Sequence, residues 1–257
     1  MNFFDLIFPK DIYCISCGRP LPVQSSPSGN EGLAICERCD GEIEWISGRC
    51  CEKCGRQLAD ENHKSLCREC SSGPEHIYRK GVACALYSGR AADMVRDMKY
   101  RGRAWLADTV AELMALRYLS EADALTGELP SYDYIVPAPM NAKKKARRGY
   151  DQAALLSEGL GRRIGIPHLG DAVRRTRNTE TMSGLSGDER RQNLAGAFAV
   201  HCDIMEMIRG KSVLLVDDVY TTGSTVNACA EVLLDAGAAA VDVMVFAIGA
   251  DAAKRSE

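Results

Sequence analysis

The sequence contains no apolar run as long as the 18 or so residues that a membrane-spanning helix needs. Its apolar opening, residues 1–9, lacks a basic start and is interrupted by Asp5 and Pro9, which is not typical of a signal peptide. The net charge of −3 gives no whole-protein electrostatic reason to bind nucleic acid, although local basic patches remain possible. These features predict a cytosolic protein that does not insert into membranes.

Several functional patterns are also absent. No G-x-x-x-x-G-K-[ST] loop occurs, which argues against a nucleotide hydrolase. Only 16 residues are aromatic, and no base-stacking platform is visible in the sequence. Histidine is scarce and forms no constellation, so we expect His63, His76, His168 and His201 to be surface or structural residues, with His63 or His76 as a possible zinc neighbour.

Cysteine, in contrast, is abundant and unevenly placed. Nine of the 12 cysteines fall between positions 14 and 70, and a cytosolic chain seldom carries stable disulfides. Two C-x-x-C turns together offer the four thiolates of a tetrahedral zinc site. The echo of "CISCGRPL" in "CEKCGRQL" indicates a duplicated unit. The sequence therefore predicts two zinc ribbons with the ligands Cys14, Cys17, Cys36, Cys39, Cys51, Cys54, Cys67 and Cys70.

The simplest ligand pairing joins consecutive pairs of C-x-x-C turns, but the spacing also allows a cross-braced arrangement. Cys50 is expected to be a bystander, with replacement of Cys51 as the alternative. This segment is poor in large apolar residues, so zinc would be structural. The other cysteines, Cys84, Cys202 and Cys229, have apolar neighbours and are expected to be core residues.

From about residue 81, apolar strand patterns alternate with helical spacing, which predicts an α/β domain with a mainly parallel sheet flanked by helices. We expect a zinc-ribbon domain at residues 1–75 and the α/β domain at residues 76–257. The last 45 residues predict a βαβ unit. Strands are expected within residues 81–88, 132–139, 196–200, 211–218 and 239–249, and helices within 90–119, 150–165 and 224–237.

The stretch "SVLLVDDVYTTGST", residues 212–225, is expected to place two carboxylates at the end of a buried strand. In an open parallel sheet, ligands bind beyond the carboxyl ends of the strands. The turn and helix start at Thr221, Thr222, Gly223, Ser224 and Thr225 suit a phosphate, because backbone N–H groups, hydroxyls and the helix dipole converge there.

Asp217 and Asp218 can accept hydrogen bonds from vicinal sugar hydroxyls or help to hold Mg²⁺. Phosphate, diol and divalent ion together describe a ribose 5-phosphate. A response-regulator receiver domain is a poor alternative, since only 39 residues follow Asp218. A solvated acidic turn with an ordinary helix cap explains only part of the ordered set.

These residues resemble the phosphoribosyl-pyrophosphate (PRPP) signature of type I phosphoribosyltransferases. With "KYRGR" at 99, "IVPAPMNAKKKARRGYDQA" at 135, "LSGDERRQNLAGAF" at 185 and the cysteine-rich start, the chain resembles the competence protein F (ComF) family over nearly its whole length. The resemblance implies PRPP binding with Mg²⁺, with Asp217 and Asp218 on the ribose hydroxyls and Thr221 to Thr225 on the 5-phosphate. It also places the turn after "YDYIVPAP" near the pyrophosphate.

Two positions depart from the family pattern near the expected acceptor pocket. Asp151 stands where many ComF-like chains have Asn, and Met182 stands where they often have Gln. The acceptor is therefore not assigned.

Basic residues gather in three clusters, at Lys143–Arg148, at Lys99, Arg101 and Arg103, and at Arg174, Arg175 and Arg177. The first cluster is a solvated loop or a contact to pyrophosphate or to a nucleic-acid backbone. A pyrophosphate leaving group needs cations or Mg²⁺. On the pyrophosphate or acceptor side we place Lys99, Arg148 and Gln152.

Two functions remain open. The first is a PRPP-dependent transferase of unknown acceptor. The second is a DNA-handling protein that keeps the PRPP pocket as a ligand or regulatory site. The ComF resemblance implies a part in DNA uptake during natural transformation, with single-stranded DNA and other DNA-uptake proteins as partners.

Overall fold

The structure is a computed structural model that describes residues 14, 16–21, 35–58, 65–73, 75–122, 126–177, 194 and 196–250. The apolar opening, His63, Met182 and most of the "LSGDERRQNLAGAF" stretch lie outside the described residues, so the expectations about them stay predictions.

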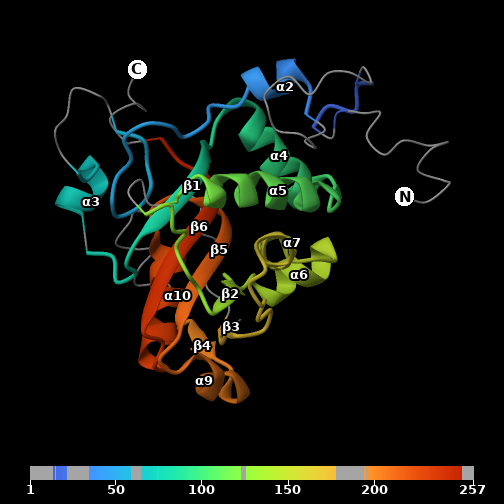
Figure 1. Ribbon diagram of the computed structural model, residues 1–257. Coiled ribbons are helices and arrows are strands. Elements are labelled where there is room, and N and C mark those ends of the chain that lie inside the picture. The colour runs from blue at the N-terminus through green and yellow to red at the C-terminus, as the bar shows by residue number, and fades with distance from the viewer. Residues whose placement is uncertain are drawn as a thin grey trace.

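A four-stranded parallel sheet forms the centre of the molecule, as predicted (Figure 1). Its strand order is β1-β6-β5-β2, with every neighbouring pair parallel. The two central strands are long and almost wholly buried. The strands are β1 (Gly81–Leu86), β2 (Tyr134–Pro137), β5 (Ser212–Tyr220) and β6 (Ala240–Ile248).

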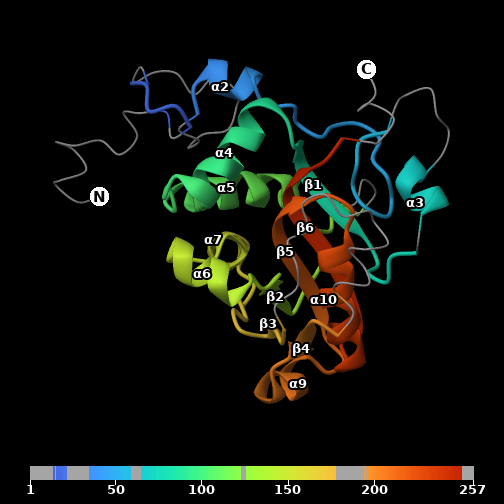
Figure 2. The same cartoon turned by 180° about the vertical axis from the view of Figure 1, so that it is seen from behind.

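Helices cover both faces of this sheet, because successive side chains of a strand point to opposite faces. On β5, Val213 and Leu215 join the core beneath α10, whereas Leu214 and Val216 join the core beneath α4, α5 and α7. The bounds are α4 (Gly89–Tyr100), α5 (Leu106–Leu119), α7 (Gln152–Ile164) and α10 (Ser224–Asp235). Figure 2 shows α10 and the α4–α5 pair on different sides of the strands.

One predicted strand lies outside the parallel sheet. The stretch "GAFAV" does form β4 (Phe198–Val200), but β4 pairs antiparallel with β3 (Val173–Arg175) in a separate two-stranded sheet. Ala172, Val173 and Phe198 pack into the α10-side core. This small sheet thus covers the end of one face and does not extend the parallel sheet. A short helix, α9 (Cys202–Ile208), follows β4.

The cysteine-rich segment packs directly on the edge strand β1. The backbone of residues 44–46 runs antiparallel to β1, with Ile46 N–H donating to the Cys84 carbonyl (2.8 Å) and Leu86 N–H donating to the Glu44 carbonyl (2.8 Å). Further along, Gly55 meets the same strand, and a Cβ added there would lie 2.6 Å from the Gly81 carbonyl oxygen. No larger residue than glycine fits this contact.

The two ribbons also supply core residues to opposite faces of the sheet. Cys14 and Cys39 of the first ribbon lie in the core beneath α4 and α5, while Cys54 and Cys67 of the second lie in the core beneath α10. Each ribbon carries one short helix, α2 (Glu37–Gly41) in the first and α3 (Arg68–Ser72) in the second. The expected boundary at residue 75 remains a prediction, since the structure joins the two parts through shared packing.

Candidate functional site

The aspartate pair lies within strand β5, whereas the sequence predicted it at the strand end. β5 continues to Tyr220 because it keeps pairing with β6 as far as Ile248. Its other neighbour, β2, stops at Pro137 opposite Val216, one residue before Asp217. The carboxylates therefore lie just past the carboxyl end of the shorter strand, where a parallel sheet offers room for a ligand.

Asp217 and Asp218 differ in their partners. Asp218 Oδ2 lies 2.7 Å from Lys99 Nζ, which reaches it from the last turn of α4. Asp217 Oδ1 accepts a hydrogen bond from the Asp218 backbone N–H (2.8 Å). Burial first, and then the negative charge of Asp218, raise the pKa of Asp217 well above its ordinary value, while Lys99 opposes the rise. A divalent cation beside this carboxylate would offset the cost of ionising it.

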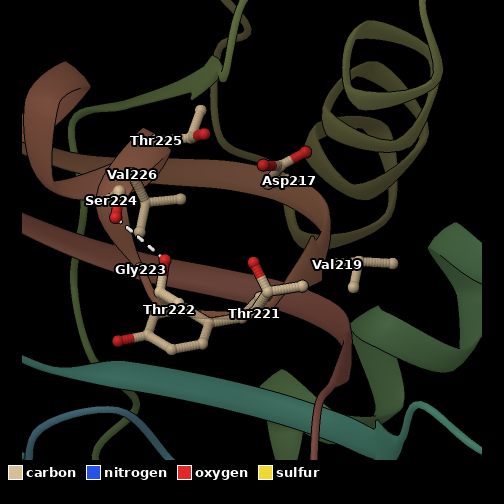
Figure 3. Close-up of a pocket in the computed structure, with 9 residues that line it drawn as sticks. Asp217, Val219, Thr221, Thr222, Gly223, Ser224, Thr225 and Val226 are labelled. Carbon is tan, nitrogen blue, oxygen red and sulfur yellow. Dashed lines mark hydrogen bonds between the residues drawn. The ribbon is translucent and has the colours of Figure 1, made fainter. Parts of the chain in front are cut away.

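Hydroxyl groups and a helix start line a cavity of about 150 Å³ beyond the aspartates (Figure 3). Thr222 Oγ1 and Ser224 Oγ hydrogen-bond to each other (2.8 Å). Gly223 is the N-cap of α10 and has a left-handed backbone (φ +76°), and a Cβ there would lie 2.3 Å from the Tyr220 hydroxyl oxygen. The chain can make this turn over Tyr220 only with glycine. Six of the seven predicted PRPP residues line this cavity, and Asp218 does not. The lining consists of Asp217, Thr221, Thr222, Gly223, Ser224 and Thr225, together with Val219, Tyr220 and Val226.

A second cavity of about 180 Å³ adjoins the first and shares Asp217 and Thr225 with it. Four cations reach it from three different elements: Lys99 from α4, Lys144 and Arg148 from α6 (Ala142–Arg148), and Arg175 from β3. The turn after β2 also lines it, through Ala138, Pro139, Met140 and Asn141. Lys99, Arg148 and Gln152, the residues predicted for the pyrophosphate or acceptor side, all line this cavity together with Asp218.

The run "KKKARR" forms helix α6, whereas a solvated loop was one of the predicted alternatives. The Asn141 side chain accepts a hydrogen bond from the Lys143 N–H (3.0 Å) and caps the helix. Helical spacing then turns Lys144 and Arg148, four residues apart, toward the same cavity. The basic cluster was visible in the sequence, but the structure shows which two of its cations line the cavity.

Arg148 and Gln152 are held by neighbours at the end of α4. The Arg148 guanidinium donates to Gln152 Oε1 and lies 5.6 Å from the Tyr100 ring centroid. Gln152 is 1% exposed, and its amide donates to the Met98 carbonyl (3.1 Å). Gln152 thus acts by positioning the Arg148 side chain. This role differs from direct contact with a ligand.

Asp151, the departure from the family pattern, caps helix α7. Its two carboxylate oxygens accept hydrogen bonds from the N–H groups of Ala154 (3.3 Å) and Met140 (3.1 Å). Burial raises the pKa of Asp151 above its ordinary value. Asp151 also lines the second cavity, and so do Lys144 and Arg175, which the sequence did not single out as site residues.

Both cysteine sets form four-sulfur clusters with the predicted consecutive pairing. Within each cluster the four sulfurs lie within 4.8 Å of one another, in the sets Cys14, Cys17, Cys36, Cys39 and Cys51, Cys54, Cys67, Cys70. A tetrahedral zinc about 2.3 Å from each sulfur places them about 3.8 Å apart. The Cys17–Cys36 and Cys54–Cys67 sulfur distances are 3.8 Å and 3.7 Å, so both clusters fit structural zinc and exclude the cross-braced pairing.

Of the remaining cysteine predictions, some are confirmed and one is wrong. Cys50 lies outside the cluster and its thiol donates to the Gly48 carbonyl, as expected of a bystander. Cys84 and Cys229 are buried core residues, as predicted. Cys202 is exposed at the start of α9, and its predicted core role is wrong, because α9 packs on the core through Ile204 and Ile208. His76 lies outside both four-sulfur clusters, and its Nε2 lies 3.0 Å from the Tyr220 hydroxyl.

Comparison with known proteins follows the same division of the chain. Residues 3–85 match the family model of the double zinc ribbon domain, and residues 146–257 match that of the phosphoribosyl transferase domain. The chain is 33% identical to competence protein F of Haemophilus influenzae over 95% of this chain and 97% of that protein. The chain belongs to the competence protein F family. It is also 32% identical to the DNA utilization protein YhgH of Escherichia coli over 90% of this chain and 94% of that protein.

Membership of the ComF family agrees with the predicted architecture of a type I phosphoribosyltransferase-like sheet preceded by a double zinc ribbon. Among solved structures, the glutamine PRPP amidotransferase of B. subtilis is similar with a TM-score of 0.38 and 18% identity, over 58% of this chain and 30% of that one. No helix in the described part of the ComF-family chain is both long and apolar enough to cross a membrane.

Proposed function

We propose that this protein binds PRPP together with Mg²⁺ in the two adjoining cavities. The observation that carries the proposal is that one cavity, lined by hydroxyl groups at the start of α10, and another, lined by four cations, share Asp217 and Thr225. PRPP has the matching form, with a 5-phosphate at one end of a ribose and a pyrophosphate at the other. The ribose would then lie over the aspartates.

The charges of the second cavity support this orientation. Lys99, Lys144, Arg148 and Arg175 attract the pyrophosphate, and Mg²⁺ would be held by the phosphate oxygens and the carboxylate side. Asp217 and Asp218 also offer acceptors to the vicinal hydroxyls of the ribose. In the free protein Lys99 neutralises Asp218, so ligand binding exchanges one ionic partner for others.

The reaction that this pocket supports is transfer of the phosphoribosyl group. An acceptor forms a bond to C1 of the ribose and loses a proton, while the bond from C1 to the pyrophosphate oxygen breaks. Pyrophosphate leaves as its Mg²⁺ complex, and the cations stabilise the charge that develops on it. The acceptor class is left open, because Asp151 alters the side where it would bind.

A second candidate function is handling of single-stranded DNA, with the PRPP pocket as a ligand or regulatory site. The names of the relatives, competence protein F and DNA utilization protein, favour a part in DNA uptake. Single-stranded DNA and other DNA-uptake proteins are then the partners, and the cytosol is the compartment. The two functions are compatible, since the two cavities would hold the small ligand and DNA would bind elsewhere on the surface.

Calorimetric titration of the zinc-loaded protein with PRPP and Mg²⁺ tests the pocket. The matched variant is Asp217→Asn with Asp218→Asn, which keeps the shape and removes both charges. We expect binding in the parent protein and at least a tenfold loss in the variant, followed by a screen for acceptors that release pyrophosphate. Absence of PRPP binding to the folded parent protein would reject the pocket assignment and leave DNA handling alone.

A further inference from the structure

Two aromatic side chains project into solvent beside the cation-lined cavity. Tyr100 (70% exposed) and Trp105 (54% exposed) are the most exposed large hydrophobic side chains in the described part of the chain. Both lie on the connection between α4 and α5, and Tyr100 itself lines the cavity. The cost of exposing such surface makes them candidates for contact with a partner.

The connection that carries these rings is held by ion pairs. Arg101 and Arg103 both bind the carboxylate of Asp97, at 2.8 Å each, and Asp97 is itself buried. The hydroxyl of Tyr150 donates to the Met98 carbonyl (2.6 Å) and ties the end of α4 to the segment between α6 and α7. The rings are thus displayed on a fixed support, which lowers the entropic cost of stacking a ligand on them.

A row of cations lies next to the rings. Lys143, Lys144, Lys145 and Arg147 of α6 are exposed, and among the described residues none of the four forms an ion pair with an acidic side chain. Arg148 links the two elements through its contact with Tyr100. Figures 1 and 2 both show α6 and the α4–α5 connection on the same side of the molecule, away from α3 of the second ribbon.

The zinc ribbons have the opposite charge. Residues 1–75 carry 12 acidic and eight basic side chains, a formal net charge of −4, and each zinc bound by four thiolates adds a further negative centre. The rest of the chain has 23 acidic and 24 basic side chains. A polyanion gains its affinity from cations that replace its counterions, so the ribbons are the unfavourable surface for DNA.

We propose that the face formed by Tyr100, Trp105 and the exposed cations of α6, here called the α4–α6 face, binds single-stranded DNA, and that the ribbons do not. Phosphates would follow α6 while unpaired bases stack on the two rings, an arrangement that duplex DNA, with its bases already stacked, cannot use. The inference rests on the proposed function for the nature of the partner and names the surface that meets it.

The charge contribution is tested with the variant Lys143→Glu/Lys145→Glu/Arg147→Glu, whose positions are exposed and line neither cavity. Affinity for a fluorescent oligothymidine is measured by anisotropy over a range of salt concentrations. Loss of three phosphate contacts should flatten the slope of log affinity against log salt by about 2. The matched control, Arg19→Glu/Arg38→Glu/Arg68→Glu, makes the same change of charge at exposed positions of the ribbons and should leave the slope unchanged.

The stacking contribution has an intrinsic reporter, because the protein has only two tryptophans, Trp45 and Trp105. In the Trp45→Phe variant, oligothymidine should quench the fluorescence of Trp105, and an abasic strand of equal length and charge should not. Trp105→Ala should weaken oligothymidine binding by about 5- to 150-fold without altering the salt slope.

Three results would overturn the proposal. In the first, the ribbon variant, and not the α6 variant, loses DNA binding. In the second, the Trp105 fluorescence is unchanged at saturating DNA. In the third, the protein binds vesicles of anionic phospholipid but no oligothymidine, which would assign the same face to a membrane surface. PRPP titration of the same α6 variant separates these failures from failure of the pocket, since its substitutions avoid both cavities.

Discussion

Lys99 and Asp218 form an ion pair of 2.7 Å across the mouth of the candidate PRPP site, between the last turn of α4 and strand β5. Burial is the largest single effect and lowers the pKa of Lys99, but the charge and hydrogen bond of Asp218, together with the charge of Asp217, more than offset it, so the pKa is raised and the ammonium is kept. The pair leaves Asp217 as the carboxylate with a raised pKa. Lys99 therefore limits the rise in the pKa of Asp217 before any ligand arrives.

Removing Lys99 should change the pH dependence of ligand binding. Mg²⁺ needs Asp217 ionised, so affinity for Mg²⁺ and PRPP should rise as pH increases through the raised pKa of Asp217. Lys99→Met takes away the charge that opposes this pKa rise, and the increase in affinity should move to higher pH. Calorimetry across pH about 5 to 9 measures the shift. Lys211→Met, at an exposed pair with Asp133, is the control, and an equal shift there would contradict the assignment.

Asp217→Asn should stabilise the free protein at neutral pH. A carboxyl with a raised pKa in the folded state contributes stability that is complete below its unfolded pKa of about 3.9 and is lost as pH rises through the folded pKa. Asparagine does not ionise, so the variant keeps the stability that the parent protein loses when Asp217 ionises. A thermal melt at neutral pH should give a melting temperature higher by about 2–4 °C for each kcal/mol relieved. A lower melting temperature would show that ionised Asp217 does not destabilise the free protein.

Gly223→Ala should damage both stability and PRPP binding. The added Cβ meets the Tyr220 hydroxyl oxygen at 2.3 Å, in addition to the cost of a left-handed backbone, which is about 1–2 kcal/mol. Gly210→Ala is the matched control, since Gly210 has φ +69° but no atom within 4 Å of the new Cβ. Denaturant unfolding should show Gly223→Ala as the more destabilised by at least about 1 kcal/mol. Equal losses would mean that Tyr220 moves aside freely.

Tyr220→Phe should expose a coupling between the ribbon side and the phosphate loop. The Tyr220 hydroxyl lies 2.9 Å from that of Tyr78 and 3.0 Å from His76 Nε2, all in buried positions. The single variant leaves the Tyr78 hydroxyl without this partner and should cost about 1–3 kcal/mol of unfolding free energy. The double variant with Tyr78→Phe should cost less than the sum of the two single variants. Simple additivity in this cycle would contradict the coupling.

Cys51→Ser and Cys50→Ser should separate a zinc ligand from its neighbour. Cys51 lies in the second four-sulfur cluster and Cys50 outside it. Metal analysis should find two zinc ions per chain in Cys50→Ser and one in Cys51→Ser, with a large fall in thermal stability only in the latter. Chelation of the parent protein should reproduce that fall. Loss of zinc from Cys50→Ser instead would show that Cys50, and not Cys51, is the zinc ligand.

The sequence by itself determined the features that depend on local spacing. Four C-x-x-C pairs predicted both zinc clusters, the alternation of strands and helices predicted a parallel sheet, and "LLVDDVYTTGST" predicted the residues of the first cavity. Each of these patterns specifies its geometry within a few residues, because a zinc knuckle, a β-strand pleat or a helix N-terminus is a local structure. Residue order was sufficient there.

Only the tertiary structure decided which distant residues meet. It ran β5 past the aspartates to Tyr220, since the length of a strand depends on the neighbour with which it pairs. It selected Lys144 and Arg175 from longer basic runs, and it placed Tyr100 and Trp105 in solvent beside α6, although their sequence neighbourhood gives no sign of a shared surface. Exposure and proximity are set by packing between elements far apart in the chain, and no local pattern records that packing.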